Sequence, residues 1–421
     1  MSRSIPFLAV VIILMLLIDI YVFQALRTVT NESSLFTRRI VYTAFWTLTT
    51  LSLSVILAAL LTDFTSWPKL YRTYLPALVL VLYISKIPAL LFIFTDDLWR
   101  GMQWVVHLFY EGTERIQQGD IAGPKISRSQ FLNIAALMAS GFLFSTFFYG
   151  MVRGAYDFRV KRIKIRLPNL PGNFDGMKIV QISDIHTGSF TTNNPLEKAV
   201  KLINRQKADM VFFTGDLVNN VSQEAERFKS TLSGVQADEG IYSILGNHDY
   251  GDYAQWPSEK EKHENLERMK AIHREMGWTL LLDENRIVTR AGEKMAVLGV
   301  QNWSANTRFR KYGNLATAHA GTEDIPFKLL LSHDPSHWGA EVTEKYHDID
   351  VTFSGHTHGM QFGIDIPGLK WSPVQYVYKQ WSGLYEKGRQ MLYVNRGLGF
   401  LGYPGRVGMW PEITVFEFSR G

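Results

Sequence analysis

The pattern of apolar and polar residues changes near residue 152, from long apolar runs to short ones separated by polar segments. Four runs of 19 to 22 residues contain at most one charge each, at residues 5–23, 40–61, 74–95 and 131–152. A helix needs about 20 apolar residues to cross the hydrocarbon core of a bilayer. The first run is too long for a signal peptide, and no small-residue cleavage site follows it. We therefore predict an all-α membrane domain of about four transmembrane helices in residues 1–152, with three or five as the alternatives.

Two features inside this domain carry further expectations. Asp19 and Lys86 are the charges that lie within the apolar runs. Either they pair or line a pathway, or each lies near the end of a span and extends to water. Residues 98–110, LWRGMQWVVHLFY, carry Trp99 and Trp104, as expected of an interfacial helix at headgroup level.

Four spans place both ends of the membrane domain on one side of the bilayer. Nine Lys or Arg residues flank the spans on that side and seven on the other, which favours a cytoplasmic second domain under the positive-inside rule. The nine are Arg3, Lys69, Arg72 and six between residues 153 and 166, and the seven are Arg27, Arg38, Arg39, Arg100, Arg115, Lys125 and Arg128. The segment RVKRIKIRLP, which holds most of the six, also alternates like a half-exposed strand.

From residue 153 onward, five short apolar segments each end in polar side chains. The segments are KIVQIS (178–183), ADMVFFT (208–214), GIYSIL (240–245), KLLLS (328–332) and IDVTFS (349–354). They are typical of buried strands. The residues that follow them are Asp184 and His186, then Asp216, then Asn247, His248 and Asp249, then His333, and last His356 and His358.

Any one of these histidines alone is more simply a loop residue bonded to backbone. Between the first two segments, however, Leu196, Val200 and Ile203 recur at helical spacing, which predicts a βαβ unit. Ligands of layered α/β sheets bind beyond the carboxyl ends of the strands. Five polar strand ends therefore predict one common site.

Composition narrows the chemistry. The chain has no cysteine, which excludes disulfides, thiolate metal sites and cysteine nucleophiles. Net charge is +3 for residues 1–152 (11 basic, 8 acidic) and +2 for residues 153–421 (33 basic, 31 acidic). Neither part has the basic excess of a nucleic-acid-binding domain, so no nucleic acid is expected as a partner.

The donor set at the strand ends suits metal ions. Imidazole, carboxylate and amide ligands together favour Mn, Fe or Zn over calcium or magnesium. The seven candidates, Asp184, His186, Asp216, Asn247, His333, His356 and His358, exceed what one ion needs. Two divalent ions that share a carboxylate, about 3.5–4 Å apart, can clamp a phosphoryl group during in-line attack. His356 and His358 would each face a different ion.

The segments SDIHTG, TGDLVNN, GNHDYG, LLSHDP and SGHTHG, in this order, resemble the five signature blocks of the calcineurin-like (metallo-dependent) phosphoesterases. The resemblance covers roughly residues 160–421 and implies an α/β fold, a four-layer αββα sandwich with a dimetal site between its two sheets. It implies three sets of ligands: Asp184, His186 and His358 for the first metal, Asn247, His333 and His356 for the second, and Asp216 as the bridge.

The same resemblance implies catalytic roles. His248 would protonate the leaving oxygen or stabilise charge on the phosphoryl group, and Asp249 would orient the ring of His248. The alternative for Asp249 is an aspartate that caps a turn.

The segments LYVNRGLGF and GRVGMWPEITVFE resemble the membrane-associated, phosphodiesterase-type branch of the family, which includes bacterial enzymes acting on UDP-2,3-diacylglucosamine. That branch usually has a second glycine after the histidine pair, where this chain has Met360. Substrate contacts are expected from Asn395, Arg396 and Arg406, because a guanidinium matches phosphate geometry; a structural loop role is the alternative for each. Residues 370–385 carry five Trp or Tyr residues, which would rest on the membrane surface, grip an acyl chain or pack a long loop.

The leading hypothesis is a multi-pass cell-membrane protein whose residues 153–421 form a dimetal phosphoester hydrolase. Its partners would be the lipid bilayer and a phosphodiester or pyrophosphate of a lipid-linked or nucleotide-linked lipid. One alternative is a phosphatase for soluble phosphoesters with the helices as an anchor. The other is a membrane scaffold or receptor with structural metals, for which a histidine placed as a general acid would have no use.

Overall fold

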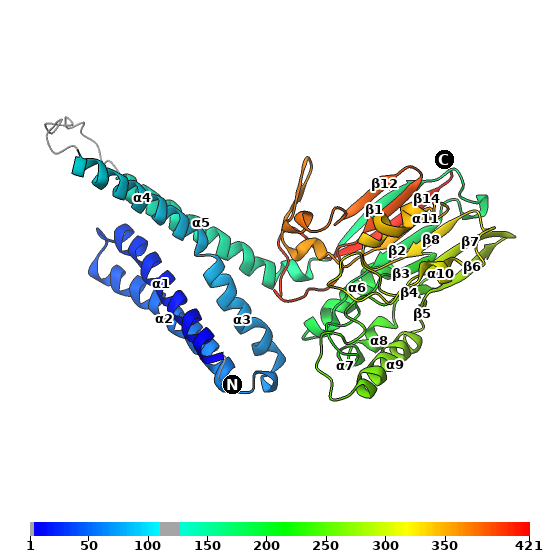
Figure 1. Cartoon of the computed structure of the whole chain (residues 1–421), viewed down its shortest axis with the longest axis horizontal. Helices are drawn as coiled ribbons and strands as arrows, with labels where there is room; N and C mark the ends of the chain where they lie inside the picture. The colour runs from blue at the N-terminus through cyan, green and yellow to red at the C-terminus, as the bar shows by residue number, and fades with distance from the viewer. Residues whose placement is uncertain (1–3, 110–126) are drawn as a thin grey trace. The chain divides into compact units, whose positions relative to one another are not determined.

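The structure, a computed structural model, describes residues 4–109 and 127–421. Two compact units make up the chain, Met1–Phe148 and Tyr149–Gly421. Figure 1 shows long helices in the first unit and two β-sheets in the second. The division lies inside helix α5 (Arg128–Val152), whose last residue is where the sequence pattern placed the domain boundary.

Among its described residues, the membrane unit contains four helical segments that are long and apolar enough to cross a membrane, as predicted. Their bounds are Leu8–Val29, Leu35–Leu61, Lys69–Val106 and Arg128–Tyr156. The helices that form them are α1 (Ser4–Val29), α2 (Leu35–Leu61), α3 (Lys69–Ile84), α4 (Ile87–Phe109) and α5.

The third span is built from two helices, α3 and α4, which meet at Ser85 and Lys86. Pro88 explains the break, because a proline ring clashes with the carbonyl four residues earlier, here that of Ile84, where α3 ends. Residues 98–109 are helical, as predicted for the segment 98–110, but they continue α4 without a break; their place at the headgroup level stays a prediction. Residues Arg3, Tyr110, Arg115 and Lys125, used in the sequence argument, lie outside the described residues.

Asp19 and Lys86 form an ion pair inside the membrane unit. Asp19 is fully buried, and its Oδ2 accepts hydrogen bonds from the Thr49 hydroxyl at 2.7 Å and the Tyr83 hydroxyl at 2.6 Å. The Lys86 ammonium also lies 4.0 Å from the centroid of the Tyr83 ring. The expectation that each charge extends separately to water is therefore corrected: the two charges neutralise each other, and the pair joins α1, α2 and the α3–α4 break.

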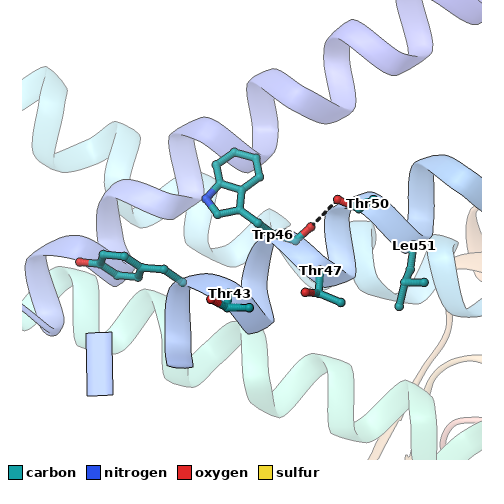
Figure 2. Close-up of a pocket in the computed structure, with 6 residues that line it drawn as sticks. Thr43, Trp46, Thr47, Thr50 and Leu51 are labelled. Atoms are coloured by element: carbon teal, nitrogen blue, oxygen red, sulfur yellow. Dashed lines mark hydrogen bonds between the residues drawn. The ribbon is translucent and has the colours of Figure 1, made fainter. Parts of the chain in front are cut away.

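The outer side of α2 shows how polar residues are tolerated there. Figure 2 shows Trp46, Thr47, Thr50 and Leu51 along this helix, beside a hollow of about 480 Å³. The Thr50 hydroxyl donates to the Trp46 carbonyl at 2.8 Å, so its polar group is satisfied within the helix. A threonine bonded in this way can face lipid without an unpaired donor.

The second unit contains two six-stranded mixed sheets and a small hairpin. The first sheet has the order β1 (Arg159–Arg166), β14 (Glu412–Ser419), β2 (Lys178–Ile182), β3 (Met210–Phe213), β4 (Ile241–Ser243) and β5 (Thr279–Leu280). The second has the order β12 (Gly383–Lys387), β13 (Gln390–Val394), β9 (Val351–Ser354), β8 (Lys328–Leu331), β7 (Glu293–Gly299) and β6 (Glu284–Arg290). Strands β10 (Ile364–Ile366) and β11 (Leu369–Trp371) form the hairpin.

Alternation along the strands builds the layers. Ile179 of β2 and Phe212 of β3 face the second sheet, in a core that they share with residues such as Val297 and Phe353. Their neighbours in sequence face the opposite way and pack against α6 (Asn194–Asn204) and α9 (Glu259–Glu275). On the far side of the second sheet, α10 (Leu315–His319) and the π-helix Trp338–Val342 complete the cover. The unit is therefore an αββα sandwich, as expected.

Parallel pairing brings the polar strand ends together. Strands β2, β3 and β4 run parallel to one another in the first sheet, and β8 runs parallel to β9 in the second. Because parallel strands end at the same edge, their carboxyl ends gather there. All five predicted strands are present, and the sequence prediction of one common site rests on this arrangement.

Candidate dimetal centre

Two groups of side chains at this edge have metal-ligand geometry. Asp184, His186 and His358 form one, and Asp216, His333 and His356 form the other. Within each group the ligand atoms all lie within 4.8 Å of one another. Five of these six side chains are buried, and His356 is half-buried.

Backbone carbonyls fix the orientation of two of the rings. Nδ1 of His186 lies 3.1 Å from the Val218 carbonyl, and Nδ1 of His333 lies 2.7 Å from the Thr214 carbonyl. A carbonyl accepts only from N–H, so each Nδ1 carries a proton and, in the neutral ring, each Nε2 keeps its lone pair. Metal-binding histidines are commonly held by such a bond on the other ring nitrogen.

The ring nitrogens that result face one another. Nε2 of His186 lies 3.1 Å from Nε2 of His358, and Nε2 of His333 lies 3.3 Å from Nδ1 of His356. Two imidazole lone pairs at this separation repel unless a cation or a proton lies between them. The donor set therefore fits one cation in each group, and lone pairs directed at a common point are what a divalent metal requires.

Asp216 and Asn247 connect the two groups. Oδ2 of Asp216 lies 3.6 Å from Nε2 of His186 and 3.2 Å from Nε2 of His333, so it faces both groups at once. Asn247 adds a seventh ligand atom, because its Oδ1 lies 2.8 Å from Nδ1 of His356 and 3.2 Å from His333. The Asn247 amide nitrogen donates to the Tyr253 hydroxyl at 2.9 Å, which turns the oxygen towards the centre.

The backbone at these positions is strained. Asp184, His186, Asp216, His356 and His358 all have positive φ, between 47° and 72°. For residues other than glycine this region costs of order 1–3 kcal/mol each, and such strain concentrates at functional sites. Strain at five candidate ligands is a second, independent sign that the edge is built for a ligand.

Tight packing around the bridge requires glycine at position 246. A Cβ atom there would lie 2.2 Å from Oδ1 of Asp216, closer than any real contact. The G-N-H-D segment thus begins with glycine because the Asp216 carboxylate occupies the space of a side chain.

Electrostatics favour positive charge at the centre. Burial acts to raise the pKa of Asp216, but the neighbouring charge of His333 outweighs it and keeps that pKa well below its usual range. Burial acts to lower the pKa of His333, yet the Asp216 carboxylate raises it to about 10. For Asp184, burial is again opposed by the adjacent His358, and the pKa falls to about 2. Two ionised carboxylates thus hold a proton on His333, the charge that a metal ion would displace.

Burial keeps His356 and His186 uncharged, as metal ligands should be. Burial lowers the pKa of His356, and it lowers that of His186 well below its usual value. Neutral imidazole is the form that binds metal.

The structure assigns Asp249 a different role from the one implied by the family resemblance. Its carboxylate accepts from the backbone N–H groups of Asp216, Leu217, Val218 and Gly246 at 2.8–3.2 Å. The expectation that it orients the His248 ring is corrected: it holds the loop that carries Asp216, and burial raises its pKa to about 7.

The Asn219 carbonyl orients His248 instead. It lies 2.6 Å from Nδ1 of His248, while the His248 backbone N–H donates to Oδ1 of Asp216 at 2.9 Å. The ring is half-buried and lies 5.0 Å from the His186 ring, centroid to centroid. A carbonyl in this place left no signal in the sequence, because any residue could supply it.

The three residues predicted to contact substrate are committed to the fold, which corrects that expectation. Asn395 is fully buried, donating to the Thr414 hydroxyl and accepting from the Gly397 N–H. Arg396 donates to the Ser382 hydroxyl and pairs with Asp365.

Arg406 is also fully buried, and it lies behind the centre. Its guanidinium donates to the carbonyls of Gly399, Met409 and Arg396. Nη2 lies 3.1 Å from Nδ1 of His358, on the side of the ring opposite the candidate metal position. Arg406 therefore supports a ligand and has no free edge for a phosphate.

Several side chains that surround the half-buried rings were not predicted from the sequence. Tyr378 places its hydroxyl 2.8 Å from Nε2 of His356 and donates to Asp334 at 3.2 Å. Phe309 and Tyr253 pack against the His356 and His248 rings, with centroids 4.7 and 4.4 Å apart. Of these residues, only Asp334 directly follows a predicted ligand, His333, so only Asp334 could have been noticed from the sequence.

Comparison with known proteins gives the class. Residues 2–155 match the family model described as "Probable Calcineurin-like phosphoesterase, transmembrane domain", and residues 177–360 match "Calcineurin-like phosphoesterase". The chain is 31% identical over 302 residues to the uncharacterized metallophosphoesterase YkuE of Bacillus subtilis, covering 70% of this chain and 98% of that protein.

Two further relatives are transmembrane or lipid-related by name. A transmembrane protein with metallophosphoesterase domain from Danio rerio is 28% identical over 276 residues, 63% of this chain and 58% of that one. The UDP-2,3-diacylglucosamine pyrophosphatase LpxG of Chlamydia trachomatis is 27% identical over 282 residues, 57% of this chain and 83% of that one. The chain belongs to the calcineurin-like phosphoesterase family, and it is a metal-dependent phosphoester hydrolase of the membrane.

Proposed function

We propose that this hydrolase cleaves phosphodiester or pyrophosphate bonds in lipid-linked or nucleotide-linked lipid substrates, of which UDP-2,3-diacylglucosamine is one candidate. Two divalent cations (Mn, Fe or Zn) would be held by the seven residues of the centre. The observation that carries the proposal is the position of Asp216, whose Oδ2 faces both ligand groups. The lipid part is supported by the four spans and by the similarity to LpxG.

Bound divalent cations would supply Lewis acidity towards a phosphoryl group and lower the pKa of water. The chain's own contribution is to hold the ligands in place before substrate arrives. The strained backbone at His356 and His358, together with the carbonyls that bind His186 and His333, leaves little to reorganise. Groups held in position in this way stabilise developing charge more strongly than the same groups would in water.

His248 is the residue we assign to proton transfer. Because the Asn219 carbonyl keeps a proton on Nδ1, the proton that the ring gains and loses is the one on Nε2. No hydrogen-bond partner for Nε2 occurs among the described residues. The ring thus has a free donor at the edge of the centre, able to protonate a leaving oxygen.

For substrate recognition we propose Arg308 in place of the three buried residues. Arg308 is exposed, and the next residue, Phe309, packs against the His356 ring with centroids 4.7 Å apart. Burial raises the pKa of Tyr253 and of Tyr378, and the positive charge of Arg308 opposes this rise in both. Arg308 therefore lies near the two tyrosines that border the His248 and His356 rings. A guanidinium there can bind a phosphate beyond the one attacked.

The test uses the detergent-solubilised full chain with manganese, on a phosphodiester with a good leaving group and on one with a poor leaving group. Asp216→Asn should abolish turnover and reduce the bound metal. Loss of a general acid costs typically about 10²–10⁴-fold, so His248→Ala should fall in this range on the poor leaving group and far less on the good one. His263→Ala, at an exposed histidine on α9, is the matched control and should match wild type.

Equal activity of wild type, Asp216→Asn and His248→Ala would reject the proposed site. Turnover of soluble monoesters alone, with none of UDP-2,3-diacylglucosamine or phospholipids, would favour the soluble-phosphatase alternative. Arg308→Gln should raise KM for diphosphate substrates with little change in kcat, while Arg310→Gln, at an arginine that pairs with Asp252, should not. The cytoplasmic side for residues 153–421 remains a prediction from the Lys and Arg count.

A further inference from the structure

The β10–β11 hairpin separates apolar and charged residues onto opposite faces. Its cross-strand pairs are Ile364 with Trp371, Asp365 with Lys370, and Ile366 with Leu369. Paired residues share a face and alternate along a strand. One face is therefore entirely apolar, and the other holds the acid and the base.

The charged face makes the hairpin's polar contacts with the rest of the unit, although Asp365 and Lys370 are themselves exposed. Asp365 pairs with Arg396, and the Lys370 ammonium donates to the Ser382 carbonyl and lies 4.8 Å from the centroid of the Trp381 ring. The apolar face is turned outward, with 42% of Ile364, 57% of Ile366 and 49% of Leu369 exposed.

The exposed apolar surface continues beyond the hairpin. Tyr376 is 78% exposed and Val377 is 68% exposed, and the Trp371 indole lies 3.5 Å from the Tyr376 hydroxyl. We call Ile364, Ile366, Leu369, Tyr376 and Val377 the apolar rim. A contiguous apolar surface of this kind on a folded domain marks a partner or a membrane.

The root of the hairpin lies beside the end of the last transmembrane span. The Gly363 N–H donates to the Val407 carbonyl at 2.9 Å, and the adjacent Arg406 N–H donates to the Gly150 carbonyl at 3.1 Å. Gly150 belongs to the last turn of α5, in the span Arg128–Tyr156. Trp410 packs edge-on against Tyr149 of the same turn, centroids 6.4 Å apart, a pair of the kind found at membrane interfaces. The backbone of Arg406 and Val407 thus connects the root of the hairpin to the last turn of α5.

We propose that the apolar rim inserts into the interfacial layer of the bilayer from which α5 emerges. The occupant follows from the position of the hairpin root, since lipid is the apolar phase next to α5 at that level. His358 lies three residues before Gln361, whose carbonyl accepts from the Val407 N–H at 2.8 Å, so insertion would also bring the dimetal centre to the membrane surface. The inference goes beyond the proposed function and does not depend on which phosphoester is cleaved.

The absence of native cysteine makes a direct test simple. The full chain, carrying Ile366→Cys or Val377→Cys with an environment-sensitive fluorophore, is reconstituted in phosphatidylcholine vesicles with and without brominated acyl chains. Both labels should shift to the blue and lose fluorescence in brominated vesicles. Ile287→Cys is the control, because Ile287 is a 40% exposed apolar residue on β6, at the far edge of its sheet.

A second variant tests whether the rim acts as one surface. Ile366→Glu should restore the fluorescence of the Val377→Cys label in brominated vesicles, whereas Ile287→Glu should leave it quenched. Circular dichroism confirms that each variant is folded. Equal quenching at positions 366, 377 and 287 would overturn the proposal, and so would a blue shift without bromine quenching, which would indicate protein contact in place of lipid.

Discussion

The two units of this protein each bury a cluster of charges, and the clusters differ in one respect. In the membrane unit, Asp19 meets Lys86, Thr49 and Tyr83, so that its charge is matched and both carboxylate oxygens accept hydrogen bonds. In the catalytic unit, histidine nitrogens face each other at 3.1 and 3.3 Å, on a backbone held in left-handed conformations. The first cluster is complete without any ligand. In the second, a proton or a cation must lie between the facing nitrogens.

This difference separates a structural cluster from a binding site. A buried ion pair whose partners are all protein groups specifies how helices pack, at little net gain in stability. In a cluster of lone pairs and carboxylates on a strained backbone, the strain lowers the stability of the ligand-free protein, and ligand binding can offset this loss. Burial and charge alone do not distinguish the two; the facing ring nitrogens and the strained backbone do.

The largest expected effect on stability is in the membrane cluster. Asp19→Ala leaves the Lys86 charge buried without a partner, which typically costs about 3–5 kcal/mol. Asp19→Ala combined with Lys86→Met should recover most of this loss. Hydrogen exchange of α1 and α2 amides in detergent measures both, with Glu32→Ala in the exposed α1–α2 turn as the control. Equal destabilisation by the single and the double variant would show that the pair is not self-contained.

Removal of metal should affect the other unit. A ligand present at about 100 times its Kd stabilises the folded state by about 2.7 kcal/mol. Chelation should therefore speed exchange of β2 and β3 amides and leave α1 and α2 unchanged. Asp216→Asn should make β2 and β3 insensitive to the chelator. If exchange in the wild type did not depend on metal, the interpretation of the second cluster as a metal site would be contradicted.

A third buried group tests whether burial of a titratable residue makes a site. His273 is fully buried and uncharged, with Ser243 at 3.0 Å from Nδ1, and burial lowers its pKa to about 3. The unfolded chain takes up this proton below about pH 6.5 and the folded chain does not. Stability is therefore unaffected above pH 6.5 and falls as pH drops towards 3, by about 2 kcal/mol at pH 5.

His273→Gln should remove this part of the pH dependence and leave metal content and turnover unchanged. Unfolding of the catalytic unit at pH 8 and pH 5, measured by exchange of β3 amides, supplies the comparison. A pH dependence identical to wild type would show that His273 is protonated in the folded protein.

The smallest effect concerns one hydrogen bond of the membrane cluster. Tyr83→Phe removes a donor to Oδ2 of Asp19, which still accepts from Thr49, so the loss should be about 1 kcal/mol. Tyr71→Phe, at an exposed tyrosine of the same helix, should cost nothing measurable. If Tyr83→Phe cost as much as Asp19→Ala, the cluster would be held by hydrogen bonds and not by charge.

Much of the fold was predictable because its signals are local. Runs of about 20 apolar residues define spans by length alone, and the continuous burial of β2 and β3 follows from their apolar composition. The break at Ser85 was missed, although Pro88 marks it, because an unbroken apolar run hides the interruption.

The candidate ligands were predictable because each follows a strand in short, recognisable segments. The groups that orient them were not. The Asn219 carbonyl behind His248, the Thr214 carbonyl behind His333 and the Tyr378 hydroxyl beside His356 leave no mark in the sequence pattern. The prediction that Arg396 and Arg406 bind phosphate was based on their charge, and it was wrong because both guanidinium groups donate to protein groups inside the fold.

By itself the amino-acid sequence determined the membrane spans, the strands and the identity of the residues at the strand ends. These depend on side-chain polarity and spacing, which are properties of neighbouring residues. Only the tertiary structure decided that Asp216 faces both ligand groups, that Asp19 pairs with Lys86, and that the apolar face of the β10–β11 hairpin points outward. Those facts depend on distances between residues far apart in the chain, and a one-dimensional pattern carries no such distances.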